Sequence, residues 1–275
     1  MQSLSRKHPW ISYVIVGVFL LWVLFPILLM FLQAIKPDLI MFSDPPKFFF
    51  KPTLDHARKI FGRSNIMTNM GNSVIVAMIT MVLSLVFGSM CAYVIGRVKF
   101  TGMALVASFI ILTRMVPVGA LMMPIYVIMH RLGLTGSYAA VICAHTTLNL
   151  PFAVLLLLGF FREIPLEMEQ AAQVDGCGHF RIFTQIAIPL IAPGLATTGI
   201  MVLLNSWNEF MFALILSGRT TRTLPIGISS FMGSVSIDWG ASSAAASLAT
   251  IPVFIFGICI QKYFIRGITS GSVKG

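Results

Sequence analysis

The sequence predicts an all-α polytopic membrane protein with six transmembrane helices, and two observations carry this prediction. Hydrophobic residues make up 57% of the 275 residues, whereas charged residues make up only 10%. So few charges cannot cover the surface of a water-soluble domain of this length. The apolar residues also form long runs without charge, and in lipid such runs close their backbone hydrogen bonds internally as helices.

The individual spans follow from the length that a bilayer requires, which is about 20 residues for a helix. Four charge-free runs are long enough, and two further runs contain a single charge each, Arg114 and Glu209. The predicted spans are residues 10–34, 69–96, 103–129, 138–160, 193–216 and 239–261. No internal repeat or soluble domain interrupts them, so we predict one transmembrane domain over residues 1–275 with both termini on the same side.

The net charge of +10 does not indicate a nucleic-acid partner, because Lys and Arg are scattered between the apolar runs. The two sets of connections carry equal numbers of Lys and Arg, so the positive-inside rule gives no orientation by count. One set contains the loops 36–63, 131–137 and 217–238, and its basic residues lie mainly in the first of these. This favours the other set, which contains the acidic connection and both termini, as cytoplasmic. We read Arg6 and Lys7 as the flank of a retained first span, and we expect a short helix at 54–60.

No catalytic or metal-binding pattern is present in the sequence. The four cysteines lie far apart, and neither Cys143 with His145 nor Cys177 with His179 repeats a ligand spacing. The sequence contains no H-E-x-x-H, no G-x-S-x-G and no G-x-x-x-x-G-K-[ST]. We therefore expect no metal, no catalysis and no ATP bound by this chain.

Polar residues within the predicted spans are candidates for a solute pathway, and they are Arg114, Asn149, Asn205, Asn208 and Glu209. The last three share a helical face if the fifth span is one helix, and Asn149 shares a face with His145. Two interpretations stay open for them: an Arg–Glu pair or helix-to-helix contact, and a pathway that binds solute. Trp207 fits stacking on a sugar or simple packing, and Pro117 and Pro124 should bend or break the third span.

The connection 161–192 concentrates the acids of the chain, because four of the nine Asp and Glu residues fall within residues 163–175. Pro165 suits the first turn of a helix, the acids that follow favour its N-terminus, and Gly176 and Gly178 suit its end. A second helix is expected from about 180 to 188. From the residues alone, this segment is either a docking element for a partner or a solvated amphipathic loop.

The segment "EQAAQVDGCGHFRIFTQIAIPLIAPG" resembles the EAA loop of permease subunits in binding-protein-dependent ABC importers. The matching positions are Ala171, Ala172, Gly176, Ile186 and Pro189, whereas Gln170 stands where the motif has Glu. Further segments such as "NSVIVA", "SWNEFMFALILSGRTTRTLPIGI" and "YFIRGITSGSVKG" resemble the carbohydrate-uptake branch of this family, which contains the maltose permease. The likeness covers essentially the whole chain.

The resemblance implies the type I ABC importer permease fold, with 161–192 as a cytoplasmic coupling loop that docks on an ATP-hydrolysing subunit. The ATPase-coupling residues that it implies are Glu169, Gln170, Ala171, Ala172, Asp175 and Gly176. It also implies a second permease subunit, two ATP-binding subunits that hold ATP and Mg, and an extracytoplasmic solute-binding protein. The expected location is the bacterial plasma membrane, with both termini cytoplasmic. An intramembrane enzyme and an ion-coupled carrier remain the alternatives, and the sequence does not indicate which sugar is moved.

Overall fold

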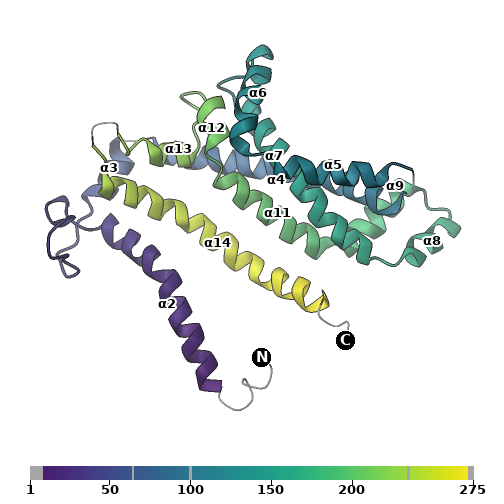
Figure 1. Cartoon of the computed structure of the whole chain (residues 1–275), viewed down its shortest axis with the longest axis horizontal. Helices are drawn as coiled ribbons and strands as arrows, with labels where there is room; N and C mark the ends of the chain where they lie inside the picture. The colour runs from purple at the N-terminus through teal and green to yellow at the C-terminus, as the bar shows by residue number, and fades with distance from the viewer. Residues whose placement is uncertain (1–8, 64, 99–100, 234–235, 272–275) are drawn as a thin grey trace. The chain divides into compact units, whose positions relative to one another are not determined.

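A computed structural model of the chain describes residues 9–63, 65–98, 101–233 and 236–271, and the regular structure within these ranges is helical (Figure 1). Arg6, Lys7 and the last residues of the chain lie outside the described residues, so the expected N-terminal flank and the side of the termini are untested. The chain divides into two compact units. One contains the described residues up to Met67 together with Ile228–Ile251, and the other contains Thr68–Gly227 together with the described residues from Pro252 onward.

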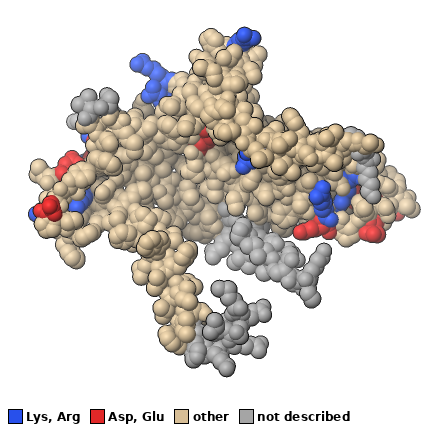
Figure 2. Space-filling model, in the orientation of Figure 1, with Lys and Arg blue, Asp and Glu red and all other residues tan. Residues whose placement is uncertain are grey.

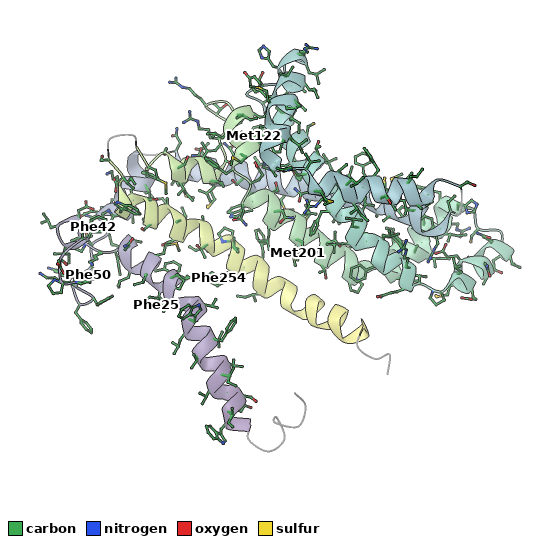
Figure 3. The ribbon with its side chains drawn as sticks, in the orientation of Figure 1. Phe25, Phe42, Phe50, Met122, Met201 and Phe254 are labelled. Atoms are coloured by element: carbon green, nitrogen blue, oxygen red, sulfur yellow. The ribbon has the colours of Figure 1, made fainter. Side chains whose placement is uncertain are left out.

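The first unit contains α2 (Pro9–Ala34), the 3-10 helix η1 (Asp38–Ile40), α3 (Asp55–Arg63) and the beginning of α14 (Trp239–Gly271). Helix α3 confirms the short helix expected in this loop. No residue in the most apolar window of α2 is buried, and Figure 3 shows Phe25 projecting away from the helix. An apolar helix that is exposed on all sides requires lipid or another apolar surface around it.

The second unit is built around two long helices, α4 (Ile66–Arg97) and α7 (Tyr138–Glu163). The shorter elements are α5 (Met103–Met115), α6 (Val118–Arg131), α8 (Leu166–Val174), α9 (His179–Ile182), the π-helical segment η2 (Phe183–Ala187), α10 (Ile188–Leu190), α11 (Ala192–Trp207), α12 (Met211–Leu216) and α13 (Leu224–Ser229).

Helix α7 is the central helix of this unit, since half of its most apolar window is buried. It begins at Tyr138 because the Ser137 side chain accepts a hydrogen bond from the N–H of Ala140. Two hydrophobic clusters lie along it. The first packs the beginning of α7 against α4, α6 and α12, and the second packs its last turns against α4 and η2.

Glycines allow the helices of the second unit to approach closely. A Cβ atom at Gly88 of α4 would lie 3.0 Å from Cβ of Ala153 in α7. A Cβ at Gly194 of α11 would lie 2.5 Å from the ring of Phe160 in α7, and one at Gly199 would lie 3.0 Å from Leu85 in α4. Small residues at such contacts are typical of helix packing in membranes, where backbone proximity replaces the hydrophobic driving force.

Two of the six expected spans are broken in the structure: the third, for which the sequence predicts a bend or break at its prolines, and the fifth, which was expected to be one helix. Helix α5 ends at Met115 because Val116, which precedes Pro117, is extended, and α6 continues at an angle of 100°. The expected break at Pro117 is thus confirmed, whereas α6 continues through Pro124. In the fifth span, α11 ends at Trp207 and α12 begins at Met211.

Within the described residues, four helices are long and apolar enough by length and composition to cross a membrane, namely α2, α4, α7 and α14. Up to six crossings result if each of the two bent pairs, α5 with α6 and α9–α10 with α11, forms one span. This range includes the expected number of six.

Candidate functional site

The segment between α7 and α11 forms a helix, a glycine turn and a second helix, as the sequence predicts. Helix α7 ends before Ile164, which is extended because Pro165 follows it, and α8 begins at Leu166. Gly176 has a φ of +82°, and its N–H donates to the carbonyl of Gln173 while that of Cys177 donates to Ala172. A left-handed glycine in this position is a frequent helix end.

Charged side chains gather over this segment on the face drawn in Figure 2, while the surface along α5 is largely uncharged. Helix α8 presents one face outward, and this face carries Gln170, Ala171 and Val174, of which Val174 is 88% exposed. Asp175 and Gly176 are exposed as well, and Ala172 is buried. Four of the six residues implied as ATPase-coupling therefore lie on the accessible side of the segment.

Glu169 points the other way and is only 5% exposed. Its Oε1 accepts a hydrogen bond of 2.7 Å from Nε of Arg97, and its Oε2 accepts one of 2.8 Å from the hydroxyl of Tyr93. Both donors belong to the last turns of α4. Sequence analysis missed Tyr93 and Arg97 as site residues; their spacing of four residues at the end of an apolar span was the available signal.

A second polar site lies where α11 and α12 are separated. The carboxylate of Glu209 accepts hydrogen bonds from the backbone N–H groups of Phe212 and Ala213, which are free at the start of α12. Its Oε2 is 2.9 Å from Nε2 of His145, an ion-pair distance without hydrogen-bond geometry. The Nδ1 atom of the same fully buried imidazole is 2.7 Å from Oγ of Ser206.

These contacts correct one expectation about the fifth span and decide one interpretation that the sequence left open. Glu209 does not lie on a helical face with Asn205 and Asn208, because α11 ends at Trp207 and Asn208 is its C-cap. Glu209 does not pair with Arg114 either. Nη1 of Arg114 donates to the carbonyl of Leu148 at 3.1 Å, and the guanidinium lies 5.1 Å from the ring centroid of Phe152.

The candidate pathway residues divide into exposed and buried side chains. Arg114, Asn205 and Asn208 are exposed on their helices, whereas Asn149 is buried and donates to the carbonyl of His145. Trp207 is 3% exposed and meets Phe256 edge-to-face with ring centroids 6.5 Å apart. Its burial favours packing over stacking on a solute.

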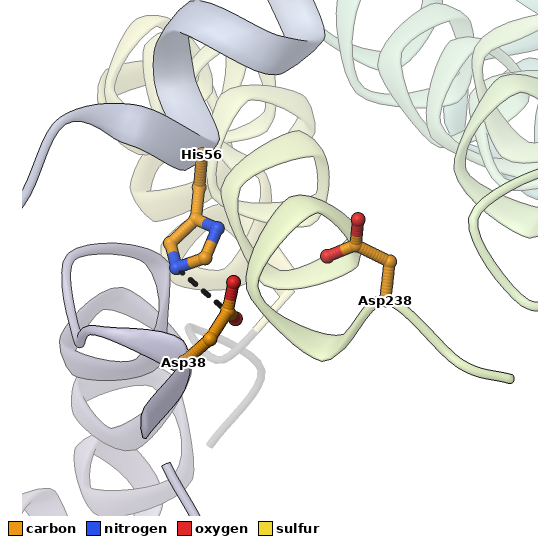
Figure 4. Close-up of side chains that lie close together, drawn as sticks. All are labelled: Asp38, His56 and Asp238. Atoms are coloured by element: carbon orange, nitrogen blue, oxygen red, sulfur yellow. Dashed lines mark ion pairs between the residues drawn. The ribbon is translucent and has the colours of Figure 1, made fainter. Parts of the chain in front are cut away.

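In the first unit, three potential metal ligands that the sequence pattern did not single out lie together: Asp38, His56 and Asp238 (Figure 4). Their ligand atoms lie within 4.8 Å of one another. Lys59 pairs with Oδ2 of Asp238, the N–H of Ala241 donates to Oδ1, and Nε2 of His56 is 2.9 Å from the carbonyl of Lys36. The carboxylate of Asp238 is thus neutralised within the chain, and an ion would have to displace Lys59.

The pKa of Asp238 reflects these contacts. Partial burial by itself raises it, but the hydrogen bonds from Lys59 and from the N–H of Ala241, with the positive charge of Lys59, outweigh burial and hold the pKa below its usual value. The pair joins α3 to the first residue before α14, so the cluster is a structural connection of the first unit.

Long apolar helices joined by a short, exposed helical elbow indicate a multi-pass membrane protein. The chain belongs to the family described as binding-protein-dependent transport system inner membrane component, whose model matches residues 84–270. Membership accounts for the apolar helices, and it disfavours the intramembrane enzyme and the ion-coupled carrier.

Similar proteins cover nearly the whole chain. It is 33% identical to the probable ABC transporter permease protein y4oR of Sinorhizobium fredii, over 98% of this chain and 96% of the relative. This chain is 34% identical to the trehalose transport system permease protein SugB of Mycobacterium tuberculosis, over 92% of this chain and 93% of the relative. The sulfoquinovosyl glycerol transport system permease protein SmoH of Agrobacterium fabrum is 32% identical, over 100% of this chain and 97% of the relative.

A solved bacterial ABC transporter for import of the acidic polysaccharide alginate has the same fold. Its chain superposes with a TM-score of 0.78 and 21% identity, over 94% of this chain and 97% of that chain. The type I importer permease fold expected from the sequence is therefore confirmed.

Proposed function

We propose that this chain is the permease subunit of an ATP-driven, binding-protein-dependent sugar importer and forms half of its translocation pathway. The similarity over full length to permeases for trehalose and sulfoquinovosyl glycerol supports a sugar or sugar derivative as the solute. The remaining components are a second permease subunit, two ATP-binding subunits that carry ATP and Mg, and an extracytoplasmic solute-binding protein. This chain performs no catalysis itself.

The observation that carries this proposal is the outward face of α8. Gln170 and Ala171 are exposed beside Val174, and Phe180 of α9 is also 74% exposed. An apolar surface next to small and polar residues, on a segment outside the long helices, fits a protein partner. We assign docking on the ATP-binding subunit to Gln170, Ala171, Asp175 and Gly176. The buried Ala172 packs on the opposite, inward side of α8.

The exposed polar residues on the spans are proposed to line the pathway. Arg114, Asn205 and Asn208 cannot face hydrocarbon without a large cost, which is about 2.5–3.5 kcal/mol for a charged residue at the centre of a span. A water-filled pathway shared with the second permease subunit would solvate them and offer hydrogen bonds to sugar hydroxyls. Asn149 and Glu209, which are held by contacts within the chain, serve to shape this region.

Docking of α8 on the ATP-binding subunit also sets the orientation. It places α8 in the cytoplasm of a bacterial cell whose plasma membrane holds the spans, and with six crossings both termini lie on that side.

The test is purification of the chain together with its cognate ATP-binding subunit, with two matched tryptophan variants. Ala171→Trp enlarges the outward face of α8 and should release the ATP-binding subunit. Leu190→Trp, at a half-exposed residue of α10, should retain it. Recovery of the native chain without any ATP-binding subunit, or solute uptake by the purified chain alone, would exclude the proposed function.

A further inference from the structure

The carboxylate of Glu169 joins α8 to the end of α4. Each of its oxygens has its own donor, the Nε of Arg97 at 2.7 Å and the hydroxyl of Tyr93 at 2.8 Å. The side chains of Arg97 and Glu169 are only 10% and 7% exposed. Charge-assisted hydrogen bonds shielded from water are stronger and geometrically more restrictive than exposed ones. We call these three residues the α8 clasp.

Arg97 also holds the connection that precedes α8. Its Nη2 donates to the carbonyl of Ile164 at 3.0 Å, so one guanidinium binds both the linker and the helix. Helix α8 has nine residues, and it is flanked by the linker at Ile164 and by the glycine turn at Gly176. Beyond these two short flanks, the clasp adds buried polar contacts that hold α8 and its linker against α4.

Tyr93 fixes the clasp to the hydrophobic core. Its ring lies 5.4 Å from that of Phe161 in α7 and 5.1 Å from that of Phe183 in η2, measured between centroids. Phe161 is fully buried in the second cluster of α7. The clasp therefore sits on packed side chains rather than on a mobile surface.

The other end of α4 is bonded to the loop between α12 and α13. Nδ2 of Asn72 donates to the carbonyls of Thr220 and Arg222 at 2.9 and 2.8 Å, and Oγ of Ser73 accepts from the N–H of Leu224 at 2.7 Å. A straight helix from Asn72 to Arg97 is about 38 Å long. Helix α4 thus has specific polar contacts at both ends.

We propose that Tyr93 and Arg97 are positioning residues, which hold Glu169 so that α8 and α4 move as one body. A displacement of α8 then reaches the segment 220–224, where the loop after α12 enters α13, at the far end of α4. This inference rests on the proposed function, because it assumes that the ATP-binding subunit moves α8.

The experiment measures the distance between two spin labels in the complete importer in lipid nanodiscs, with the native cysteines replaced by serine. Met168→Cys labels the flank of α8, and Val74→Cys labels an exposed position on α4. In the native clasp, we expect one narrow distance distribution that is the same without nucleotide and after trapping with ATP and vanadate. In Glu169→Gln and Arg97→Gln, a second distance or a broader distribution should appear.

Tyr93→Phe removes one donor and keeps the ring, so it should give an intermediate width even if a charge variant folds poorly. The controls are Glu163→Gln and Arg162→Gln, exposed residues at the end of α7, which should match the native distribution. A distance that shifts on trapping in the native importer, or clasp variants as narrow as the native chain, would overturn the proposal. The ATP-binding subunit is quantified in each sample, because its absence from the native complex contradicts the proposed function instead.

Discussion

Glu209 and His145 meet 2.9 Å apart at the break between α11 and α12. The same carboxylate closes the start of α12 by accepting two backbone N–H groups, and the same imidazole contacts Ser206 at the end of α11. One buried pair thus connects α7 with both halves of the broken span. The break is held by specific contacts, and it divides a stretch whose composition alone indicates a continuous helix.

Glu209→Ala should lower the free energy of unfolding by about 1–3 kcal/mol, because it removes the cap of α12 and leaves its N–H groups unpaired. Glu209→Gln keeps one acceptor oxygen and should lose less. The measurement is the melting temperature of the detergent-solubilised chain. Asn205→Ala, at an exposed residue of the neighbouring turn, should leave the melting temperature unchanged. If Asn205→Ala lowered the melting temperature as much as Glu209→Ala, the role of Glu209 would be contradicted.

Gly176→Val should uncouple ATP hydrolysis from uptake without preventing membrane insertion. The φ of +82° is unfavourable for a β-branched residue, whereas no atom lies within 4 Å of the position that a Cβ would take. Backbone conformation, not bulk within the chain, is therefore the constraint. Gly176→Asn, which tolerates this conformation, should retain most coupling, as should Gly178→Ala, whose φ is −72°. Uptake and ATP hydrolysis are measured together in proteoliposomes, and normal coupling in Gly176→Val would refute the prediction.

Gly194→Ala should destabilise the packing of α11 on α7 by about 1–3 kcal/mol, the usual range for overpacking. The added Cβ would lie 2.5 Å from the ring of Phe160, too close for the ring to remain in place. Thermal unfolding of the single variant should therefore occur at a lower temperature, and the double variant with Phe160→Leu should recover part of the loss. Gly159→Ala, at a position of α7 with no atom nearby, serves as the control.

The pair of Lys59 and Asp238 should make the stability of the first unit depend on pH. Because the pKa of Asp238 is lowered in the folded chain, its contribution is fully present above the unfolded pKa of about 3.9 and is lost as pH falls through the lower folded pKa. Lys59→Met should therefore lower the melting temperature at pH 7, and this effect should shrink progressively as pH falls below about 3.9. Arg58→Met, which removes an exposed cation of the same helix, should have no such pH-dependent effect.

The sequence predicted the long helices well because their signal is local. Apolar runs of sufficient length determine α2, α4, α7 and α14, and Pro165 with Gly176 determines both ends of α8. The break at Pro117 was equally readable, since proline constrains the residue before it wherever it occurs. The break at Glu209 was not readable from the sequence, because no proline or glycine marks it. The carboxylate of Glu209 caps α12 only once α12 has formed.

The amino-acid sequence by itself determined that this chain lies in a membrane, where its longest apolar helices fall and where the exposed elbow lies, because hydropathy and turn residues act over a few neighbouring positions. Only the tertiary structure decided the partners of the scarce charges. Arg97 and Glu169 are separated by 72 residues, and His145 and Glu209 by a similar distance along the chain. Such pairs form only once helices pack, since each buried charge then takes whichever partner the neighbouring helix brings within reach.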